Sequence, residues 1–197
     1  MRADAKKNYD HILAVARAVV TVDGADASLR DIARKADVGL GTLYRHFPTR
    51  EALLETLLRA SFDELTAQAR EVETAGGIDV ALVAWLRDVV ACARNYKGVI
   101  SAMMAAMEDE NSALHASCVT MRAAGTRLLV RAQAEGLART DMDGEDLFSL
   151  AAALAWLGDQ PSSAPRAERL FNIIASSILT DASRKTNLHL TSGPSTL

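Results

Sequence analysis

The chain is poor in the residues that mark several common classes of protein. Among its 197 residues there are two cysteines, Cys92 and Cys118, far apart and with no Cys-x-x-Cys pair, which argues against a disulfide scaffold and a zinc site. No run of about 18 or more residues is both apolar and free of charge, so no transmembrane helix is expected. The N-terminus, MRADAKKNYD, lacks the apolar run of a signal peptide. We therefore expect a cytoplasmic protein with no membrane partner.

Signals of catalysis and of cofactor binding are missing as well. The run from Gly39 to Gly41 lacks the third glycine and the preceding strand of a dinucleotide loop, and there is no Gly-x-Ser-x-Gly, His-Glu-x-x-His or Walker motif. His115 and Cys118 are three residues apart and follow acidic residues 108–110, but they do not complete a ligand set. We expect neither enzymatic activity nor a cofactor, with a metal or thiol sensor as the alternative.

What the chain does contain is an abundance of small and aliphatic residues. Hydrophobic residues make up 49% of the sequence and aromatic residues only 5%, a composition that favours helices packed closely through small side chains. No stretch of useful length alternates apolar and polar residues as a β-strand does. The sequence therefore predicts an all-α protein with about nine helices.

Apolar residues recur at helical spacing in successive segments. They predict helices over residues 4–22, 28–36, 39–47, 49–72, 78–95, 98–108, 112–135, 145–157 and 166–180. The first three would form a three-helix head over residues 1–50, and the others a helical-bundle body over residues 51–181 that the helix from Thr49 links to the head. Residues 182–197 are polar and rich in Ser and Thr, which predicts a disordered tail.

Residues 28–47, SLRDIARKADVGLGTLYRHF, have the pattern most specific to a function. Ser28 is placed to cap the first of two short amphipathic helices. Asp37 stands at the turn between them and tolerates the left-handed conformation better than most residues. Pro48 ends the second helix. Two short helices joined in this way are the plan of the helix-turn-helix, whose second helix enters the major groove of DNA.

Charge is divided unevenly along the chain. The net charge is −3, but residues 1–50 contain nine Lys or Arg and six Asp or Glu, a net of +3, and the remainder has a net of −6. This asymmetry agrees with a head that faces DNA and an acidic body.

The second helix has the small and polar residues that a major-groove reader needs. Gly41 permits close approach, Thr42 offers a hydroxyl to phosphate and a methyl to thymine, and Arg45 can form two hydrogen bonds to guanine. Tyr44 and His46 offer donors to the DNA backbone, although His46 could instead pack or cap. These side chains predict both phosphate contacts, which set affinity, and base contacts, which set sequence preference.

The same stretch resembles a known family. GTLYRHFPTREALLETLL, preceded by LRDIARKADV, is similar to the DNA-binding domain of the tetracycline-repressor (TetR) family of bacterial transcription regulators, and the resemblance covers about residues 7–58. It implies that the bases are approached by Gly41 and Thr42. It also implies phosphate contacts by Arg30, Tyr44, His46 and Arg50.

The chain departs from the family pattern around the turn. The family often has glycine where this chain has Asp37, and serine where it has Gly39. Leu40 replaces a residue that is commonly polar or charged, and either contacts a thymine methyl or reads no base. The predicted DNA-binding set is Arg30, Leu40, Gly41, Thr42, Tyr44, Arg45, His46 and Arg50.

The last two predicted helices are apolar over more than one face, which predicts a surface that meets a partner. By the resemblance, this surface pairs with a second copy of the chain, and the symmetry of such a homodimer requires a roughly palindromic operator. The predicted dimerisation residues are Leu147, Phe148, Leu154, Leu170, Phe171, Ile174 and Ile178.

A second apolar set, rich in methionine, lies on other helices of the predicted body. Methionine side chains suit adaptable pockets, so the set predicts a hydrophobic site for an unidentified small-molecule effector, with ordinary core filling as the alternative. The predicted ligand-binding residues are Trp85, Met103, Met107, Cys118 and Met121.

Together these features predict a dimeric, sequence-specific transcription regulator that binds double-stranded DNA. We expect a repressor that is released from a palindromic operator by a small, mainly apolar ligand. A helical interaction module without DNA binding is the remaining alternative.

Overall fold

The computed structural model describes the backbone of residues 2–73, 77–96 and 98–180 and the side chains from Lys6 onward. The predicted tail, residues 182–197, lies outside this part of the chain. The regular elements of the described ranges are helical, apart from an isolated bridge between Ala138 and Leu179. The all-α prediction is confirmed. No described helix is long and apolar enough to cross a membrane.

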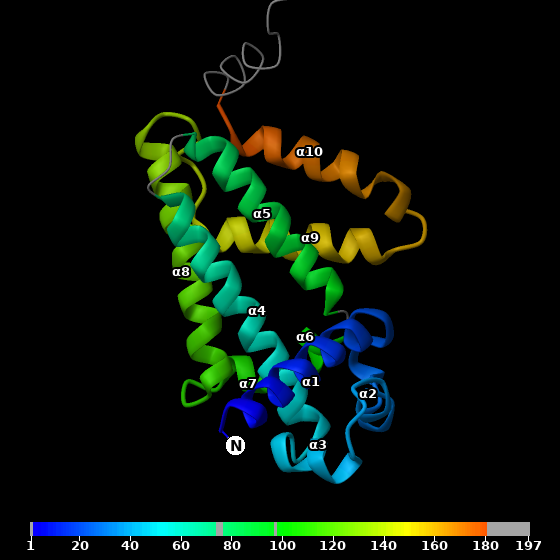
Figure 1. Cartoon of the computed structure of the whole chain (residues 1–197). Coiled ribbons are helices and arrows are strands. Elements are labelled where there is room, and N and C mark those ends of the chain that lie inside the picture. The colour runs from blue at the N-terminus through cyan, green and yellow to red at the C-terminus, as the bar shows by residue number, and fades with distance from the viewer. Residues whose placement is uncertain (1, 74–76, 97, 181–197) are drawn as a thin grey trace, which may run out of the picture. The chain divides into compact units, whose positions relative to one another are not determined.

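The described residues form ten α-helices (Figure 1). These are α1 (Arg2–Asp23), α2 (Leu29–Lys35), α3 (Leu40–His46), α4 (Arg50–Glu73), α5 (Ile78–Asn95), α6 (Val99–Ala102), α7 (Met104–Glu108), α8 (Ala113–Ala134), α9 (Gly144–Asp159) and α10 (Ala167–Ile178), with short 3₁₀ turns at Gly24–Asp26 and Ala164–Arg166. The one extra helix arises because residues 98–108 are not continuous. At Met103 the backbone turns out of helical geometry, with φ −100° and ψ 6°.

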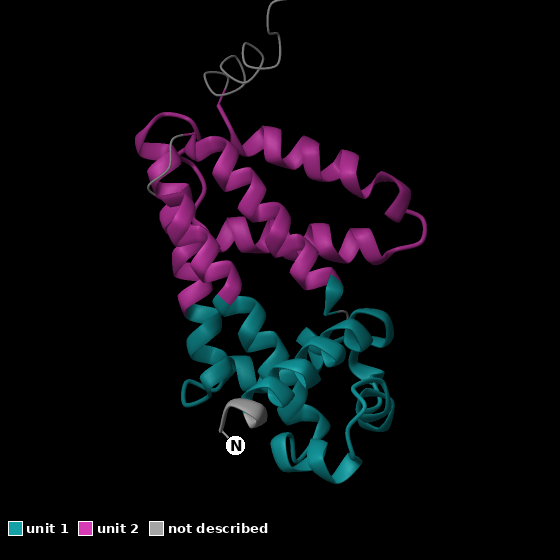
Figure 2. Ribbon diagram, viewed as in Figure 1, with its two compact units in different colours: residues 1–63, 95–119 teal, residues 64–94, 120–197 magenta. Residues whose placement is uncertain are grey.

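The chain divides into two compact units (Figure 2). Unit 1 consists of residues 1–63 and 95–119, and unit 2 of residues 64–94 and 120–197. This division differs from the predicted head over 1–50 and body over 51–181, because α6, α7 and the start of α8 belong to unit 1. The functional domains therefore stay a prediction. The helix predicted from Thr49 is present as α4, which is continuous and contributes residues to both units.

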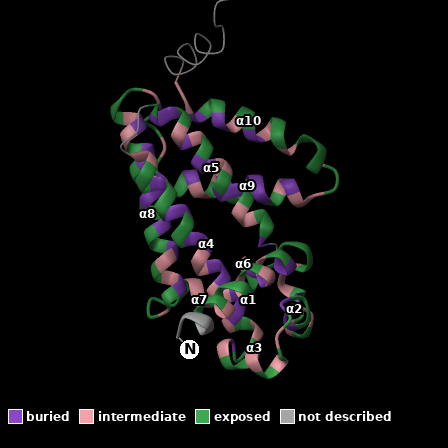
Figure 3. Ribbon diagram, viewed as in Figure 1, coloured by how far each residue is buried: buried purple, intermediate pink, exposed green. Residues whose placement is uncertain are grey.

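In unit 1, α1, α2, α3 and the first part of α4 share an apolar core (Figure 3). Its buried members follow the helical spacing read from the sequence: Ile12, Ala16, Val19, Val20, Ile32, Ala33, Leu43, Phe47, Leu53, Leu54 and Leu57. Tyr96, which follows α5, is also buried and donates its hydroxyl to the carbonyl oxygen of Leu57, at 3.3 Å. Through this core the two short helices α2 and α3 pack against the longer helices α1, which precedes them, and α4, which follows them.

In unit 2, the indole of Trp85 on α5 lies at the centre of the packing. Its Nε1 donates to the carbonyl oxygen of Leu65 at 2.8 Å, and its ring meets Phe148 of α9 edge-on, with centroids 6.0 Å apart. Gly125 on α8 leaves the space that the indole fills, because a Cβ added there would lie 2.3 Å from Trp85 Cη2. Residues of α4, α8 and α9 thus contact the indole that α5 supplies.

Replacing Gly125 with alanine is expected to lower the free energy of unfolding by about 1–3 kcal/mol, because the added methyl overlaps the Trp85 ring. Denaturant titration followed by circular dichroism measures this change. Gly41→Ala is the matched control, since a Cβ on Gly41 in α3 meets nothing within 4 Å. That variant is expected to gain up to about 1 kcal/mol from helix propensity. Equal effects at the two glycines would contradict the packing described.

Candidate nucleic-acid interface

The helix pair α2–α3 is set by local signals in the sequence. Ser28 caps α2 as predicted, with the backbone N–H of Asp31 donating to its Oγ at 3.5 Å. Asp37 adopts the left-handed conformation, with φ 52°. The N–H of Val38 bonds the carbonyl of Ala33 at 3.0 Å, and that of Asp37 bonds the carbonyl of Arg34 at 3.3 Å. These two bonds are the Schellman pattern of a helix end, so α2 stops and the chain turns toward α3.

The other end of α3 is defined just as locally. Phe47 is extended, with φ −132° and ψ 91°, as expected for the residue before Pro48. Thr49 then caps α4, because the N–H of Ala52 donates to its Oγ1 at 3.1 Å. Inside the pair, Leu43 and Phe47 are buried. The apolar side of α3 is therefore used in the core of unit 1, and its polar residues are left on other sides.

The residues predicted to bind DNA all lie in unit 1, on α2, α3 and the first turn of α4. Those on the surface are Arg30, Gly41, Tyr44 and Arg45, and those partly covered are Leu40, Thr42, His46 and Arg50. None of the eight is buried. Tyr44 has 46% of its surface exposed, which is high for a large aromatic side chain.

Arg45 and Thr42 form the one side-chain contact within α3 that bears on base reading. Arg45 Nη2 donates to Thr42 Oγ1 at 2.9 Å, one helical turn away. The bond uses one edge of the guanidinium and leaves its other donors available. It restricts the rotamers of a long side chain, which lowers the entropy lost when that side chain binds.

Tyr9 of α1 is a contributor that sequence reasoning missed. Its ring contacts the His46 imidazole edge-on at 5.7 Å between centroids and stacks on Phe47 at 5.3 Å. His46 therefore packs against Tyr9, in agreement with the alternative that this side chain packs rather than contacts DNA. It also remains partly exposed. The available signal was position, since Tyr9 stands three residues before buried Ile12 on the same face of α1.

Arginines of α2 differ in their freedom to contact an anion. Arg34 is engaged by Asp31 at 3.1 Å, one turn earlier on the same helix. Arg30 lies beside them in sequence and is exposed. This pairing supports the interpretation of Arg34 as a solvated surface residue and of Arg30 as the candidate phosphate contact on α2.

The predicted ligand-binding residues are divided between the two units. Met103, Met107 and Cys118 belong to unit 1, whereas Trp85 and Met121 belong to unit 2. All are buried except Met107, which is partly exposed. The indole of Trp85 is engaged by Leu65 and Phe148, as described above. Burial agrees with both interpretations of this set, effector contact and core filling.

Most of the predicted dimerisation residues lie inside unit 2 rather than on its surface. The buried ones are Leu147, Leu154, Phe171 and Ile178, and the partly exposed ones are Phe148, Leu170 and Ile174. The large apolar side chains that α9 and α10 do expose are Trp156, at 63%, and Ile173, at 52%. Both helices are apolar on more than one face, and spacing alone does not distinguish the inner face from the outer one. The dimerisation set stays a prediction.

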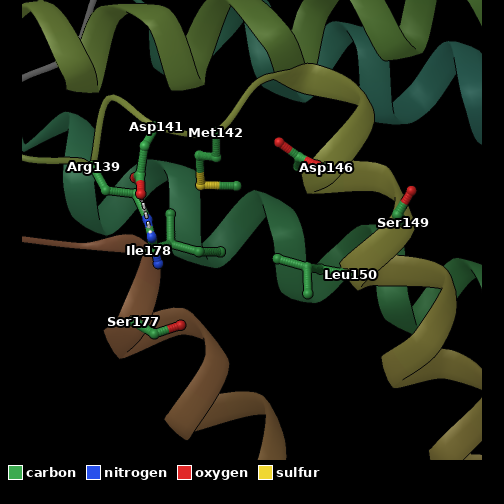
Figure 4. A pocket seen from close by; sticks show the side chains of 8 residues that line it. All are labelled: Arg139, Asp141, Met142, Asp146, Ser149, Leu150, Ser177 and Ile178. Atoms are coloured by element: carbon green, nitrogen blue, oxygen red, sulfur yellow. Dashed lines mark hydrogen bonds and ion pairs between the residues drawn. The ribbon is translucent and has the colours of Figure 1, made fainter.

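One cavity of about 390 Å³ lies at the start of α9 and the end of α10 (Figure 4). It is lined by Arg139, Asp141, Met142, Asp146, Ser149, Leu150, Ser177 and Ile178. Arg139 donates twice to the Asp141 carboxylate, at 2.6 Å in each case, and this hydrogen bonding lowers the pKa of Asp141 from 3.8 to about 2. Asp146 accepts from the N–H of Asp143 at 3.1 Å. The charged groups of this cavity thus already have partners.

His115 has a structural role as a link between two helices. Its Nδ1 lies 2.8 Å from the carbonyl oxygen of Met107, which ties the start of α8 to α7 within unit 1. Within the described ranges, no three His, Cys, Asp or Glu residues gather in a way that could hold a metal ion.

Models of known protein families match both the N-terminal and the C-terminal part of the chain. The family model described as "Bacterial regulatory proteins, tetR family" matches residues 12–57, and that described as "Transcriptional regulator SbtR-like, C-terminal domain" matches residues 79–178, about half of the chain. The protein belongs to the TetR family. The first match contains all of the helix-turn-helix, which confirms the resemblance seen in the sequence.

Solved structures of TetR regulators agree over most of the chain. The TetR transcriptional regulator SCO0520 from Streptomyces coelicolor is 34% identical, with a TM-score of 0.70, over 87% of this chain and 98% of that one. The TetR regulatory protein from Mycobacterium vanbaalenii is 28% identical, with a TM-score of 0.66, over 91% and 99%. The chain is thus a TetR-family transcriptional regulator in sequence and in fold.

Likeness to curated relatives is confined to a shorter segment. The HTH-type transcriptional repressor KstR of Mycolicibacterium smegmatis is 37% identical over 73 residues, which is 36% of either protein. An HTH-type transcriptional regulator of Staphylococcus aureus is 30% identical over 74 residues and 40% of its length. The chain aligns with well under half of the length of these relatives, so the similarity to them is limited to the aligned segment.

Proposed function

We propose that this TetR-family regulator is a homodimeric repressor that reads a palindromic operator through α3 and leaves it when a small, mainly apolar ligand binds. The observation that carries the proposal is the polar edge of α3. Tyr44 and Arg45 are exposed there, and Thr42 restrains Arg45, while Leu43 and Phe47 anchor the same helix in the core. A helix that is rigidly held and exposes an arginine suits the major groove.

The contacts divide by chemistry. Arg30, Arg50, Tyr44 and His46 would bind phosphates and set the register of the protein on the duplex. Arg45 would pair with guanine, Thr42 and Leu40 would meet thymine methyl groups, and Gly41 would allow the helix to approach the bases. Only these contacts with the bases depend on the DNA sequence.

The dimer would form through the exposed apolar side chains of α9 and α10. Trp156 and Ile173 lie on these packed helices, and the partly exposed Leu170 and Ile174 lie beside Ile173 in sequence. A two-fold axis would place one α3 at each half-site, about 34–36 Å or a multiple of it apart. The palindrome follows from that symmetry.

Release would depend on a coupling between ligand and DNA. We retain Trp85, Met103, Met107, Cys118 and Met121 as proposed effector contacts, because their side chains are apolar and mostly polarizable. The continuity of α4 from Arg50 to Glu73 supports it as the element that transmits the change. Linkage requires that operator DNA lowers the affinity of the protein for the ligand by the same factor as the ligand lowers its affinity for the operator.

Selection of DNA from a random pool tests the core of the proposal. The purified chain is expected to enrich a palindrome, and a thermal-shift screen of small apolar compounds is then expected to yield one that lowers affinity for it. Failure to enrich any sequence would favour the interaction module over the DNA-binding regulator. Independent binding of ligand and operator would leave the regulator but remove the proposed release.

Salt dependence provides a quantitative prediction for the phosphate contacts. If Arg30 and Arg50 of both protomers neutralise phosphates, the slope of log K against log salt concentration is expected to be about −4. Arg30→Gln should reduce it to about −2 with no change in the preferred sequence. Fluorescence anisotropy at several salt concentrations measures both. Arg34→Gln is the matched control, because Arg34 is on the same helix and is paired with Asp31; an equal reduction there would refute the assignment.

A further inference from the structure

A second cavity, of about 240 Å³, lies within unit 2 among α5, α9 and α10, the helices labelled in Figure 1. It is lined by Arg87, Val90, Ala91, Arg94, Leu154, Ala167, Glu168 and Phe171. Pockets for drug-sized ligands measure about 300–1,000 Å³, so this one suits a fragment-sized molecule. None of its lining residues belongs to the proposed DNA or effector contacts.

One of its two arginines is paired with an acidic residue of the protein. Arg87 Nη1 donates to both carboxylate oxygens of Glu168, at 2.5 and 2.7 Å, and its Nη2 donates to Asn172 at 3.2 Å. Its guanidinium also lies over the Phe171 ring, 4.1 Å from the centroid. Arg87 and Glu168 therefore neutralise each other and tie α5 to α10.

The other arginine is not engaged in this way. Arg94, at the end of α5, is exposed, and the described residues give it neither a hydrogen bond nor an ion pair. Its guanidinium lies against α9 at Gly158, where an added Cβ would be 2.8 Å from Nε and 3.0 Å from Cζ. Glycine inside a helix costs stability relative to alanine, and here it makes the room in which the guanidinium lies.

The cavity thus combines one uncommitted positive charge with apolar walls. Val90, Leu154 and Phe171 are buried and supply those walls. We propose that the cavity binds a small amphipathic monoanion, with a carboxylate on Arg94 and a short aromatic or aliphatic body against Val90, Leu154 and Phe171. The planar guanidinium fork matches a carboxylate in two parallel hydrogen bonds. Because Arg94 is exposed, binding is expected to be modest and to weaken with salt.

Benzoate is a suitable probe, and benzamide has the same shape without the charge. Isothermal titration calorimetry of the full chain is expected to show saturable benzoate binding at millimolar concentrations and at least about tenfold weaker benzamide binding. Arg94→Gln should weaken the binding of benzoate by a similar factor. Ala91→Phe should also abolish binding, because it fills the cavity without altering its charge.

Arg131→Gln removes a charge from α8 of the same unit, away from the lining residues, and is expected to bind benzoate like the unaltered chain. Circular dichroism verifies that each variant is folded. Equal binding of benzoate and benzamide, unchanged binding by Arg94→Gln, or no benzoate binding in the millimolar range would each overturn the proposal. No DNA takes part in the test, so its failure leaves the proposed function untouched.

Discussion

Placing glutamate at both Trp156 and Ile173 is expected to dissociate the proposed dimer and to weaken binding to a palindromic operator by more than about a hundredfold. Both side chains are apolar and more than half exposed, so the substitutions add charge at the proposed interface without opening the core. The loss is large because a monomer forfeits the effective concentration that links its two half-sites. Sedimentation velocity measures the association, and fluorescence anisotropy measures the affinity.

A matched double variant separates interface from general surface effects. Val80 on α5 and Val130 on α8 are exposed to a similar degree, at 53% and 55%, and Val80→Glu with Val130→Glu adds the same charge. That variant is expected to remain dimeric and to bind the operator normally. The affinity of the Trp156 and Ile173 double variant for an isolated half-site should also be unchanged. A dimer that survives the two glutamates would refute this surface.

Replacing Arg45 with alanine is expected to cost about 1–3 kcal/mol of operator binding and to abolish the preference at one base pair in each half-site. Arg45 is exposed on α3 and restrained by Thr42 at 2.9 Å, so truncation removes an arginine that is already oriented. Competition binding against operators with each base pair substituted in turn measures both effects.

Arg34→Ala is the appropriate control for Arg45→Ala. It removes the same charge from the neighbouring helix α2, where Arg34 is paired with Asp31. Its effect should be small and independent of sequence, as for a solvated surface charge. If Arg45→Ala instead weakens all sequences equally, Arg45 contacts phosphate rather than guanine.

Much of unit 1 could be predicted because its signals are local. The caps at Ser28 and Thr49, the left-handed turn at Asp37 and the extended residue before Pro48 all depend on a few neighbouring residues. Outside unit 1, the bounds of α5, Ile78–Asn95, were also predicted to the residue. Helix existence and helix ends follow from backbone preferences that act over one turn.

Features that depend on distant neighbours were predicted less well. The spacing of apolar residues predicted a single helix over 98–108, and the structure divides it at Met103. Tyr9 was not recognised as a support of His46, because their contact joins α1 to α3 across the core of unit 1. The pairing of Arg87 with Glu168 joins residues 81 positions apart, and Arg94 lies against Gly158 of another helix. Both contacts are beyond the reach of any local pattern.

By itself, the sequence determined the helical class, the helix-turn-helix and the polar residues that α3 carries, because amphipathic spacing, caps and a turn are properties of neighbouring residues. Only the tertiary structure decided which faces of α9 and α10 are covered. Leu147, Leu154, Phe171 and Ile178 are as apolar as Trp156 and Ile173, but the first four are buried and the last two are exposed. A helix that is apolar on several faces does not specify which of them points inward. That choice depends on what the other helices leave uncovered.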